Sequence, residues 1–309
     1  MNCYAEAVAA RFSGPGMHSE GFAVMKDKKP HWTGRVELVE KHLSDPQRWK
    51  KPRRIFVNSM SDLFHEALSD VEIARVFGVM AGAPRHTFQI LTKRPERMRR
   101  WISGCSNADK LGWMTHNGKP PKGYGGNGFI VGADDKWPLP NVCLGVSVED
   151  QPTADERIPP LLETPAAVRF VSYEPALQAV RFCRGCPGCP NDCAWCPTPD
   201  GRGLHWVIVG GESGPGARPF DVGWAYATLK ACRAAGVACF VKQLGLLPFT
   251  VRDGHRIALR PGAFRYERHG GLYFENDGYG DIRDLKGGEW SEWPKDLRVR
   301  EFPTTSVPA

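Results

Sequence analysis

The sequence contains no apolar run long enough to cross a bilayer, and no basic stretch precedes a hydrophobic core at its start, where Glu6 already adds a negative charge. We therefore expect neither a membrane anchor nor a signal peptide, and a cytoplasmic location. What is present is an ordinary soluble composition, 41% hydrophobic and 24% charged. A chain of 309 residues can form one large α/β domain with additions, or two small domains.

Six short β-branched or aromatic runs recur along the chain, and each breaks into polar side chains. They occupy residues 55–62, 88–94, 142–149, 168–174, 206–212 and 237–243. Apolar runs of this length, separated by helix-like stretches, are typical of buried parallel strands in repeated βα units. The sequence therefore predicts an α/β fold, a partial or full (β/α) TIM-type barrel.

The polar side chains at the ends of these runs are the candidate site residues. In a barrel, the carboxyl ends of the strands open onto one cavity, where charged and hydroxyl groups form an active site. Polar residues could also simply mark where a strand leaves the core, but these exits carry charged residues rather than the Gly, Asn and Pro of ordinary turns. The exit residues are Asn58, Ser59, Ser61, Asp62, Thr92, Lys93, Arg94, Ser147, Glu149, Ser172, Glu174, Glu212, Ser213, Lys242 and Gln243.

Two helices can be placed from the pattern of apolar residues. One begins near Tyr4 and runs to about Phe12. The other spans residues 71–81, with Asp70 as its expected N-cap. The apolar stripe of this second helix consists of Ile73, Val76, Phe77 and Met80.

The net charge of +7 is unevenly distributed. Lys50, Lys51, Arg53 and Arg54 precede one predicted strand, and Arg94, Arg97 and Arg100 share one helical face. Such a stripe could attract the phosphates of a nucleic acid or of a small anionic substrate. An equally good interpretation is an ordinary solvated helix face.

The predicted domain organisation has two parts. Residues 1–243 form the barrel domain, which contains a loop insert at 105–140 and a Cys-rich insert at 183–203. Residues 244–309 alternate aromatic and charged residues between Gly-rich turns, and we expect a small β extension packed on the barrel.

Ten cysteines in a reducing compartment point to metal binding rather than to disulfides where they cluster. The cluster Cys183, Cys186, Cys189, Cys193 and Cys196 has the spacing C-x2-C-x2-C-x3-C-x2-C. It suits a structural zinc, or an iron-sulfur cluster of the bacterial ferredoxin kind, although Ala194 replaces the proline of that motif. Cys143, Cys232 and Cys239 lie on apolar faces and are expected to be core residues.

A glycine-rich turn follows the fifth run, at residues 210–216. Its glycines would let backbone amides approach a ligand closely, as in anion-binding nests. A tight connection without a ligand is the more common use of such a turn.

Specific motifs give the chain a family resemblance. They are Cys-Tyr-Ala-Glu at 3–6, Ile-Phe-Val-Asn-Ser-Met-Ser-Asp-Leu-Phe-His at 55–65, Leu-Thr-Lys-Arg-Pro-Glu at 91–96, Gly-Val-Ser-Val-Glu at 145–149, Ser-Tyr-Glu-Pro at 172–175 and Val-Gly-Gly-Glu-Ser-Gly-Pro-Gly-Ala-Arg-Pro at 209–219. With these motifs the sequence resembles the phage gp thirty-seven / gp sixty-eight family over nearly its whole length. That uncharacterised family looks like a divergent relative of the radical S-adenosylmethionine enzymes.

The resemblance implies a [4Fe-4S] cluster with one open iron for S-adenosylmethionine, held by a three-cysteine motif after the first barrel strand. Of those cysteines the chain has only the last, Cys3. Either the start codon is placed too late, on a methionine inside the motif, or this copy is degenerate. The intact later strand ends favour the first explanation.

Two functions from different classes follow. In the first, a radical S-adenosylmethionine-type enzyme acts on an unknown substrate: Cys3 ligates the cluster, Ser147, Glu149, Gly210, Gly211, Glu212 and Ser213 hold the cofactor, and Asp62, Lys93, Arg94, Glu174 and Lys242 face the substrate. In the second, the five-cysteine insert is a zinc knuckle and the basic stripe binds a nucleic acid or a partner protein without catalysis. The two are compatible if the substrate is itself a nucleic acid.

Overall fold

The computed structural model describes residues 4–17, 19–104, 138–182, 203–259 and 282–303. The elements in chain order are α1 (Tyr4–Arg11), β1 (Ala23–Lys26), β2 (Lys29–Trp32), α2 (Glu40–Leu43), α3 (Asp45–Arg48), β3 (Arg54–Val57), α4 (Asp70–Ala81), β4 (Thr87–Thr92), α5 (Pro95–Gly104), β5 (Val142–Val148), α7 (Gln151–Glu163), β6 (Val168–Tyr173), β7 (Trp206–Gly210), β8 (Phe220–Asp221), α8 (Val222–Ala235), β9 (Ala238–Gln243), β10 (Pro248–Arg252), β11 (His255–Ala258), η2 (Trp290–Glu292) and η3 (Lys295–Leu297). None of the helices described is long and apolar enough to cross a membrane.

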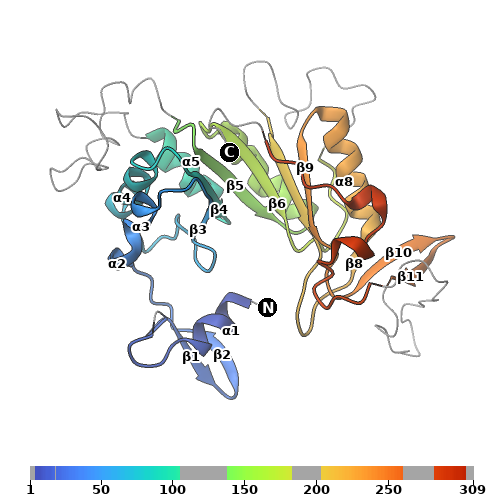
Figure 1. The fold of residues 1–309 in the computed structure, drawn as a ribbon, viewed down its shortest axis with the longest axis horizontal. Helices are drawn as coiled ribbons and strands as arrows, with labels where there is room; N and C mark the ends of the chain where they lie inside the picture. The colour runs from blue at the N-terminus through green and yellow to red at the C-terminus, as the bar shows by residue number, and fades with distance from the viewer. Residues whose placement is uncertain (1–3, 18, 105–137, 183–202, 260–281, 304–309) are drawn as a thin grey trace. The chain divides into compact units, whose positions relative to one another are not determined.

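The central element is a six-stranded sheet with the order β3-β4-β5-β6-β7-β9. All six predicted strands are present, and the pairs β3/β4, β6/β7 and β7/β9 are parallel. Helices alternate with the strands, α4 between β3 and β4, α7 between β5 and β6, and α8 between β7 and β9 (Figure 1). The mixed α/β prediction is confirmed, and this strand order is consistent with part of a β/α barrel.

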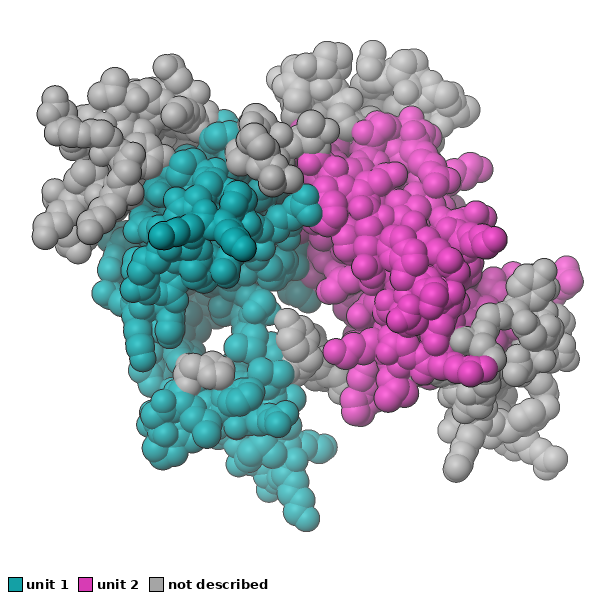
Figure 2. Space-filling view, in the orientation of Figure 1, with its two compact units in different colours: residues 1–144, 164–167, 305–309 teal, residues 145–163, 168–304 magenta. Residues whose placement is uncertain are grey.

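The chain divides into two compact units (Figure 2). Unit 1 comprises residues 1–144, 164–167 and 305–309, and unit 2 comprises residues 145–163 and 168–304. Strand β5 contributes its first residues to unit 1 and the rest to unit 2. The predicted boundary at residue 243 stays a prediction, as do the two inserts, most of whose residues lie outside the described ranges.

In unit 1, α4 packs the predicted stripe of Ile73, Val76, Phe77 and Met80, all of them buried. The helix begins one residue earlier than predicted, and its N-cap is Ser69 rather than Asp70. The Ser69 hydroxyl accepts a hydrogen bond from the Glu72 amide, while the Glu72 carboxylate accepts one from the Ser69 amide. This capping box satisfies two groups at the helix start.

A second unit 1 feature is the small module formed by α1 and the hairpin β1–β2, which contact each other (Figure 1). Ala9 and Ala10 of α1 pack with Ala23 of β1. The Trp32 amide donates to the Glu6 carboxylate at 2.9 Å. With such small side chains inside, the module leaves larger apolar residues on its surface.

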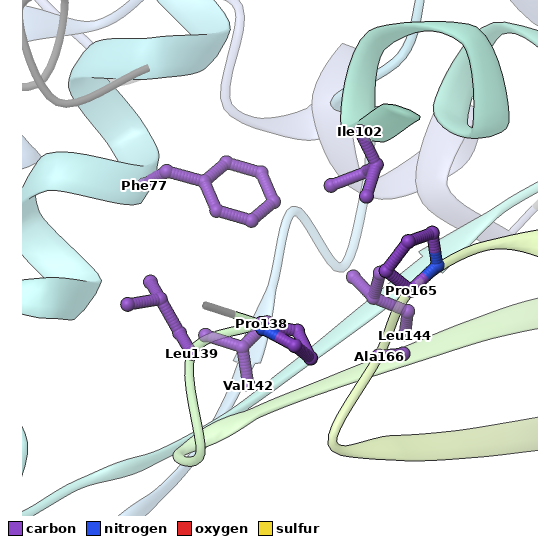
Figure 3. A pocket seen from close by; sticks show the side chains of 8 residues that line it. All are labelled: Phe77, Ile102, Pro138, Leu139, Val142, Leu144, Pro165 and Ala166. Atoms are coloured by element: carbon purple, nitrogen blue, oxygen red, sulfur yellow. The ribbon is translucent and has the colours of Figure 1, made fainter. Parts of the chain in front are cut away.

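Unit 1 also contains a small pocket, shown in Figure 3. Phe77 from α4, Ile102 from α5, and Val142 and Leu144 from β5 line it. Because its lining side chains are apolar, it is a packing gap of the core rather than a site for chemistry.

In unit 2, β6 and β7 are buried along their whole length. The outer edge of β9 is covered by residues 299–301: the Val241 amide donates to the Val299 carbonyl, and the Glu301 amide donates to the Cys239 carbonyl, each at 2.9 Å. This cover protects an edge that would otherwise expose unpaired backbone groups.

Three cysteines outside the cluster are core residues, as predicted. Cys143, Cys232 and Cys239 are all free thiols and buried. Burial raises the pKa of Cys143 to about 12, which makes it unreactive at neutral pH.

Beyond Gln243, β10 and β11 form an antiparallel hairpin, and β10 also pairs in parallel with β8. A β hairpin therefore follows the strands of the six-stranded sheet. The predicted strand around Tyr273 lies outside the described residues.

Candidate strand-end site

Three glutamates mark the ends of neighbouring strands in unit 2. Glu149 follows β5, Glu174 follows β6 and Glu212 follows β7. Their side chains are 13%, 14% and 12% exposed, so each is largely buried. A buried carboxylate needs compensating partners, and each of the three has a cation beside it.

Glu149 is held by Arg157 of α7. Nη1 of Arg157 lies 3.0 Å from Oε2 of Glu149 and donates to the Ser147 carbonyl at 2.9 Å. The Ser147 hydroxyl donates to the other Glu149 oxygen at 3.4 Å. The Arg157 side chain is itself only 14% exposed, and its Nε is buried without a hydrogen-bond partner among the described residues. The pair is thus fixed in place, with one buried donor that has no acceptor among the described residues.

Glu174 has a more open environment. The Ser172 hydroxyl donates to its Oε2 at 3.1 Å, and Nζ of Lys242 lies 3.3 Å away. Lys242 is 56% exposed, so it can move without disturbing the core. The Ser-x-Glu pattern at the ends of β5 and β6 places a hydroxyl beside the carboxylate in both cases, because residues two apart in a strand share a face.

Glu212 is bound from two directions by Arg218. Nε and the backbone amide of Arg218 donate to Oε2 at 2.8 and 2.9 Å, and Nη2 donates to Oε1 at 3.0 Å. Burial alone would raise the pKa of Glu212, but the hydrogen bonds and charge of Arg218 outweigh it and lower the pKa below its ordinary value. Glu212 is therefore an anion at neutral pH.

The glycine-rich turn allows close packing within the wall of the site. A Cβ on Gly210 would stand 2.9 Å from Oε1 of Glu174, and one on Gly211 would stand 2.5 Å from the Leu244 carbonyl oxygen. Nε2 of Gln243 donates to the Gly211 carbonyl at 2.8 Å. Ser213 is exposed. The cofactor-binding role of Gly210, Gly211 and Ser213 stays a prediction.

The remaining candidate residues lie in unit 1. Asp62 accepts from the Thr92 hydroxyl at 2.7 Å, and from Nη1 of Arg94 and the backbone amides of Lys93 and Phe64 at 3.0 Å each. These bonds tie the loop after β3 to the end of β4. Asn58 and Ser61 bond to each other within the same loop. A single cavity shared by all six strand ends stays a prediction.

The basic stripe is largely engaged inside the protein. Arg94 pairs with Glu66 at 2.8 Å as well as with Asp62, and Arg97 donates to the carbonyls of Phe64, His65 and Leu68. Arg100 is exposed. Arg94 and Arg97 thus hold the loop after β3 in place. Because their guanidinium groups already bind partners within the protein, they are poorly placed to bind phosphates.

The sequence did not reveal the arginines that complete the strand-end site. Arg157 lies two helical turns beyond Glu149, and only a search for basic residues on the helix after each strand would have found it. Arg218 follows the glycine-rich turn and belongs to the motif at 209–219, but the sequence assigned it no role. Neither residue lies beside its partner in the sequence.

The predicted metal ligands Cys3, Cys183, Cys186, Cys189, Cys193 and Cys196 lie outside the described residues. Within the described ranges, no group of His, Cys, Asp and Glu side chains could hold a metal ion. Zinc and iron-sulfur binding therefore stay predictions.

A family profile described as "Protein of unknown function (DUF5131)" matches residues 1–294. The chain belongs to this family. No curated protein and no solved structure matches it. Membership of DUF5131 covers both units of the fold, including every strand end described above.

Proposed function

We propose that this DUF5131 protein is a β/α-barrel enzyme of the radical S-adenosylmethionine type, which binds that cofactor at the strand-end site of unit 2. The observation that supports the proposal best is the set of carboxylates at three neighbouring strand ends, Glu149, Glu174 and Glu212. Active sites of β/α barrels lie at this end of the strands. The family resemblance seen in the sequence suggests the chemistry.

The carboxylates of the site suit S-adenosylmethionine, a ligand with an ammonium, a sulfonium and two ribose hydroxyls. Carboxylates accept hydrogen bonds from ammonium and hydroxyl groups, and their charge favours a cation. Arg218 and Lys242 are 50% and 56% exposed, so they can turn towards solvent and leave Glu212 and Glu174 to a ligand. When bound at a reduced cluster, the cofactor supplies hydrogen-atom abstraction.

The residues have different tasks in this proposal. Arg157 holds Glu149 in one orientation, since both side chains are largely buried, and Glu149 is then a fixed acceptor for ribose hydroxyls. Glu212 binds the ammonium group. Glu174, which lies beside Gly210, and its partner Lys242 orient the substrate. The cluster ligands would be Cys3 and the cysteines of its motif, and no step above depends on their geometry.

The test is performed on protein purified without oxygen, both as this chain and with the upstream reading frame added at its N-terminus. Iron and sulfide are quantified after reconstitution, and release of 5′-deoxyadenosine is followed under reducing conditions. The proposal predicts iron, sulfide and 5′-deoxyadenosine in at least one form. If both forms hold only zinc and leave S-adenosylmethionine intact, the enzymatic proposal is wrong.

A further inference from the structure

The hairpin β1–β2 of unit 1 has one strongly basic face. Its register pairs Lys26 with Lys29 and Val24 with His31, which places these four side chains on the same side. Asp27 and Lys28 form the connecting turn, and both have positive φ, 50° and 60°. This is the backbone of a tight two-residue hairpin turn.

The opposite side of the hairpin faces α1. Ala23 lies on that side and is buried against Ala9 and Ala10. The basic side has no such cover among the described residues, and Lys26, Lys28, Lys29 and His31 are all exposed. The face is therefore held in a fixed orientation by a packed helix behind it.

The charges on this face are not balanced within the described residues. Lys26 and Lys29 stand directly opposite each other, an arrangement that destabilises a β-ladder. No hydrogen bond or ion pair to Lys26, Lys28 or Lys29 occurs in the described ranges. The carboxylate of Glu37 does not pair with these lysines, because it pairs with Arg35. Asp27 is the one acidic residue between Lys26 and Lys29. An anionic partner would remove the repulsion.

The shape of the hairpin and the spacing of its charges favour a nucleic acid over other polyanions. A two-stranded ribbon fits the major groove of a duplex, and lysines on one face can contact successive phosphates. Val24, which is 48% exposed, lies on the same face opposite His31 and adds apolar surface beside the lysines, whereas Met25 and Trp32 lie on the side of Ala23.

We propose that the basic face of hairpin β1–β2, made of Lys26, Lys28, Lys29 and His31, binds the phosphate backbone of a nucleic acid. The sequence pointed to the stripe on α5 for this role, but Arg94 and Arg97 are occupied there by Asp62, Glu66 and backbone carbonyls. The proposal does not depend on the chemistry of the strand-end site.

The test measures binding of the full chain to short fluorescent duplex and single-stranded oligonucleotides over a range of salt concentrations. The triple variant Lys26→Gln, Lys28→Gln, Lys29→Gln should lower the slope of log K against log salt by roughly 2 to 3, since each phosphate contact contributes about 0.9. The control Lys41→Gln, Lys230→Gln, Lys295→Gln removes the same charge from exposed positions elsewhere and should keep the slope.

Three results would overturn the proposal: no binding by the unmodified chain, equal losses in both triple variants, or binding to anionic phosphatidylserine vesicles without binding to oligonucleotides. Thermal unfolding is a folding control, and the hairpin triple should unfold no earlier than the unmodified chain because it removes a repulsive pair. The single variant Lys28→Gln, in the turn, should lower the slope by about 0.9 and provides a second, milder test.

Discussion

Burial separates the cations of the strand-end site into two kinds. Arg157 is almost covered and bonds to a covered carboxylate, whereas Arg218 and Lys242 are half exposed. An ion pair shielded from water is costly to break, because the remaining charge stays buried. An exposed cation can be lost at little cost.

This difference predicts unequal effects of two matched substitutions. Arg157→Met should lower the free energy of unfolding by about 3 kcal/mol, since it leaves Glu149 buried without its guanidinium. Arg218→Met should cost about 1 kcal/mol or less, since water can replace half of what Arg218 provides. Urea denaturation measures both, and equal costs would contradict the assignment of Arg157 as the fixed partner.

His205 predicts a pH dependence of stability in unit 2. Its Nδ1 accepts from the Arg169 amide at 3.1 Å, and burial, followed by the charge of Arg169, lowers the pKa of His205 below its ordinary value. The unfolded chain therefore takes up this proton at a higher pH than the folded chain. Well above the unfolded pKa of about 6.5, His205 is neutral in both states and does not change the free energy of unfolding. That free energy falls as the pH drops through this value towards the folded pKa.

The measurement is urea denaturation at several pH values. His205→Asn should flatten the loss of stability below about pH 6.5, while His31→Asn, at an exposed side chain, should leave the slope as it is. A slope that His205→Asn does not change would refute this origin.

At the scale of elements, the start of α4 depends on one serine. Ser69→Ala removes the cap of the Glu72 amide and the hydroxyl that donates to the Glu72 carboxylate, while the backbone amide at 69 still donates to that carboxylate, and should cost about 1 kcal/mol. Asp70→Ala removes a favourable charge in the first turn and an exposed ion pair with Arg97 at 3.8 Å, and should cost about 0.5 kcal/mol. A larger cost for Asp70→Ala in thermal or urea unfolding would restore Asp70 as the cap.

The close contact between β5 and β6 requires a glycine at position 145, which has no side chain. A Cβ on Gly145 would stand 2.5 Å from the Phe170 ring, so Gly145→Ala should cost about 1 to 3 kcal/mol by overpacking. Phe170→Leu makes room, and the double variant should lose less than the sum of the two single variants. Additive losses in a double-mutant cycle would show that the ring and Gly145 are not coupled.

At the scale of the whole molecule, the sequence predicted what depends on local pattern. The six strands and the stripe of α4 follow from runs and periods of apolar residues, which burial requires wherever the chain folds. The cap was misplaced by one position because Ser69 and Asp70 are both good caps, and only the backbone decides between them. Local chemistry alone does not distinguish such neighbours.

The partners of the site residues could not be predicted in the same way. Glu149 and Arg157 are brought together by the turn between β5 and α7, and Arg97 reaches carbonyls about thirty residues away in sequence. Composition marked Arg94 and Arg97 as a surface stripe, but their carboxylate and carbonyl partners become visible only in the fold. Charge counted along the sequence therefore does not show which cations are already paired within the fold.

The most direct test of the proposed function is the affinity of the full chain for S-adenosylmethionine, measured by calorimetry without oxygen. The unmodified protein should bind the cofactor, and Glu212→Gln should weaken binding by about tenfold or more, through loss of a charged hydrogen bond. Glu37→Gln, which removes an exposed glutamate that also pairs with an arginine, should bind as the unmodified protein does. No binding, or the same affinity in Glu212→Gln, would contradict the placement of the cofactor at the ends of β5, β6 and β7.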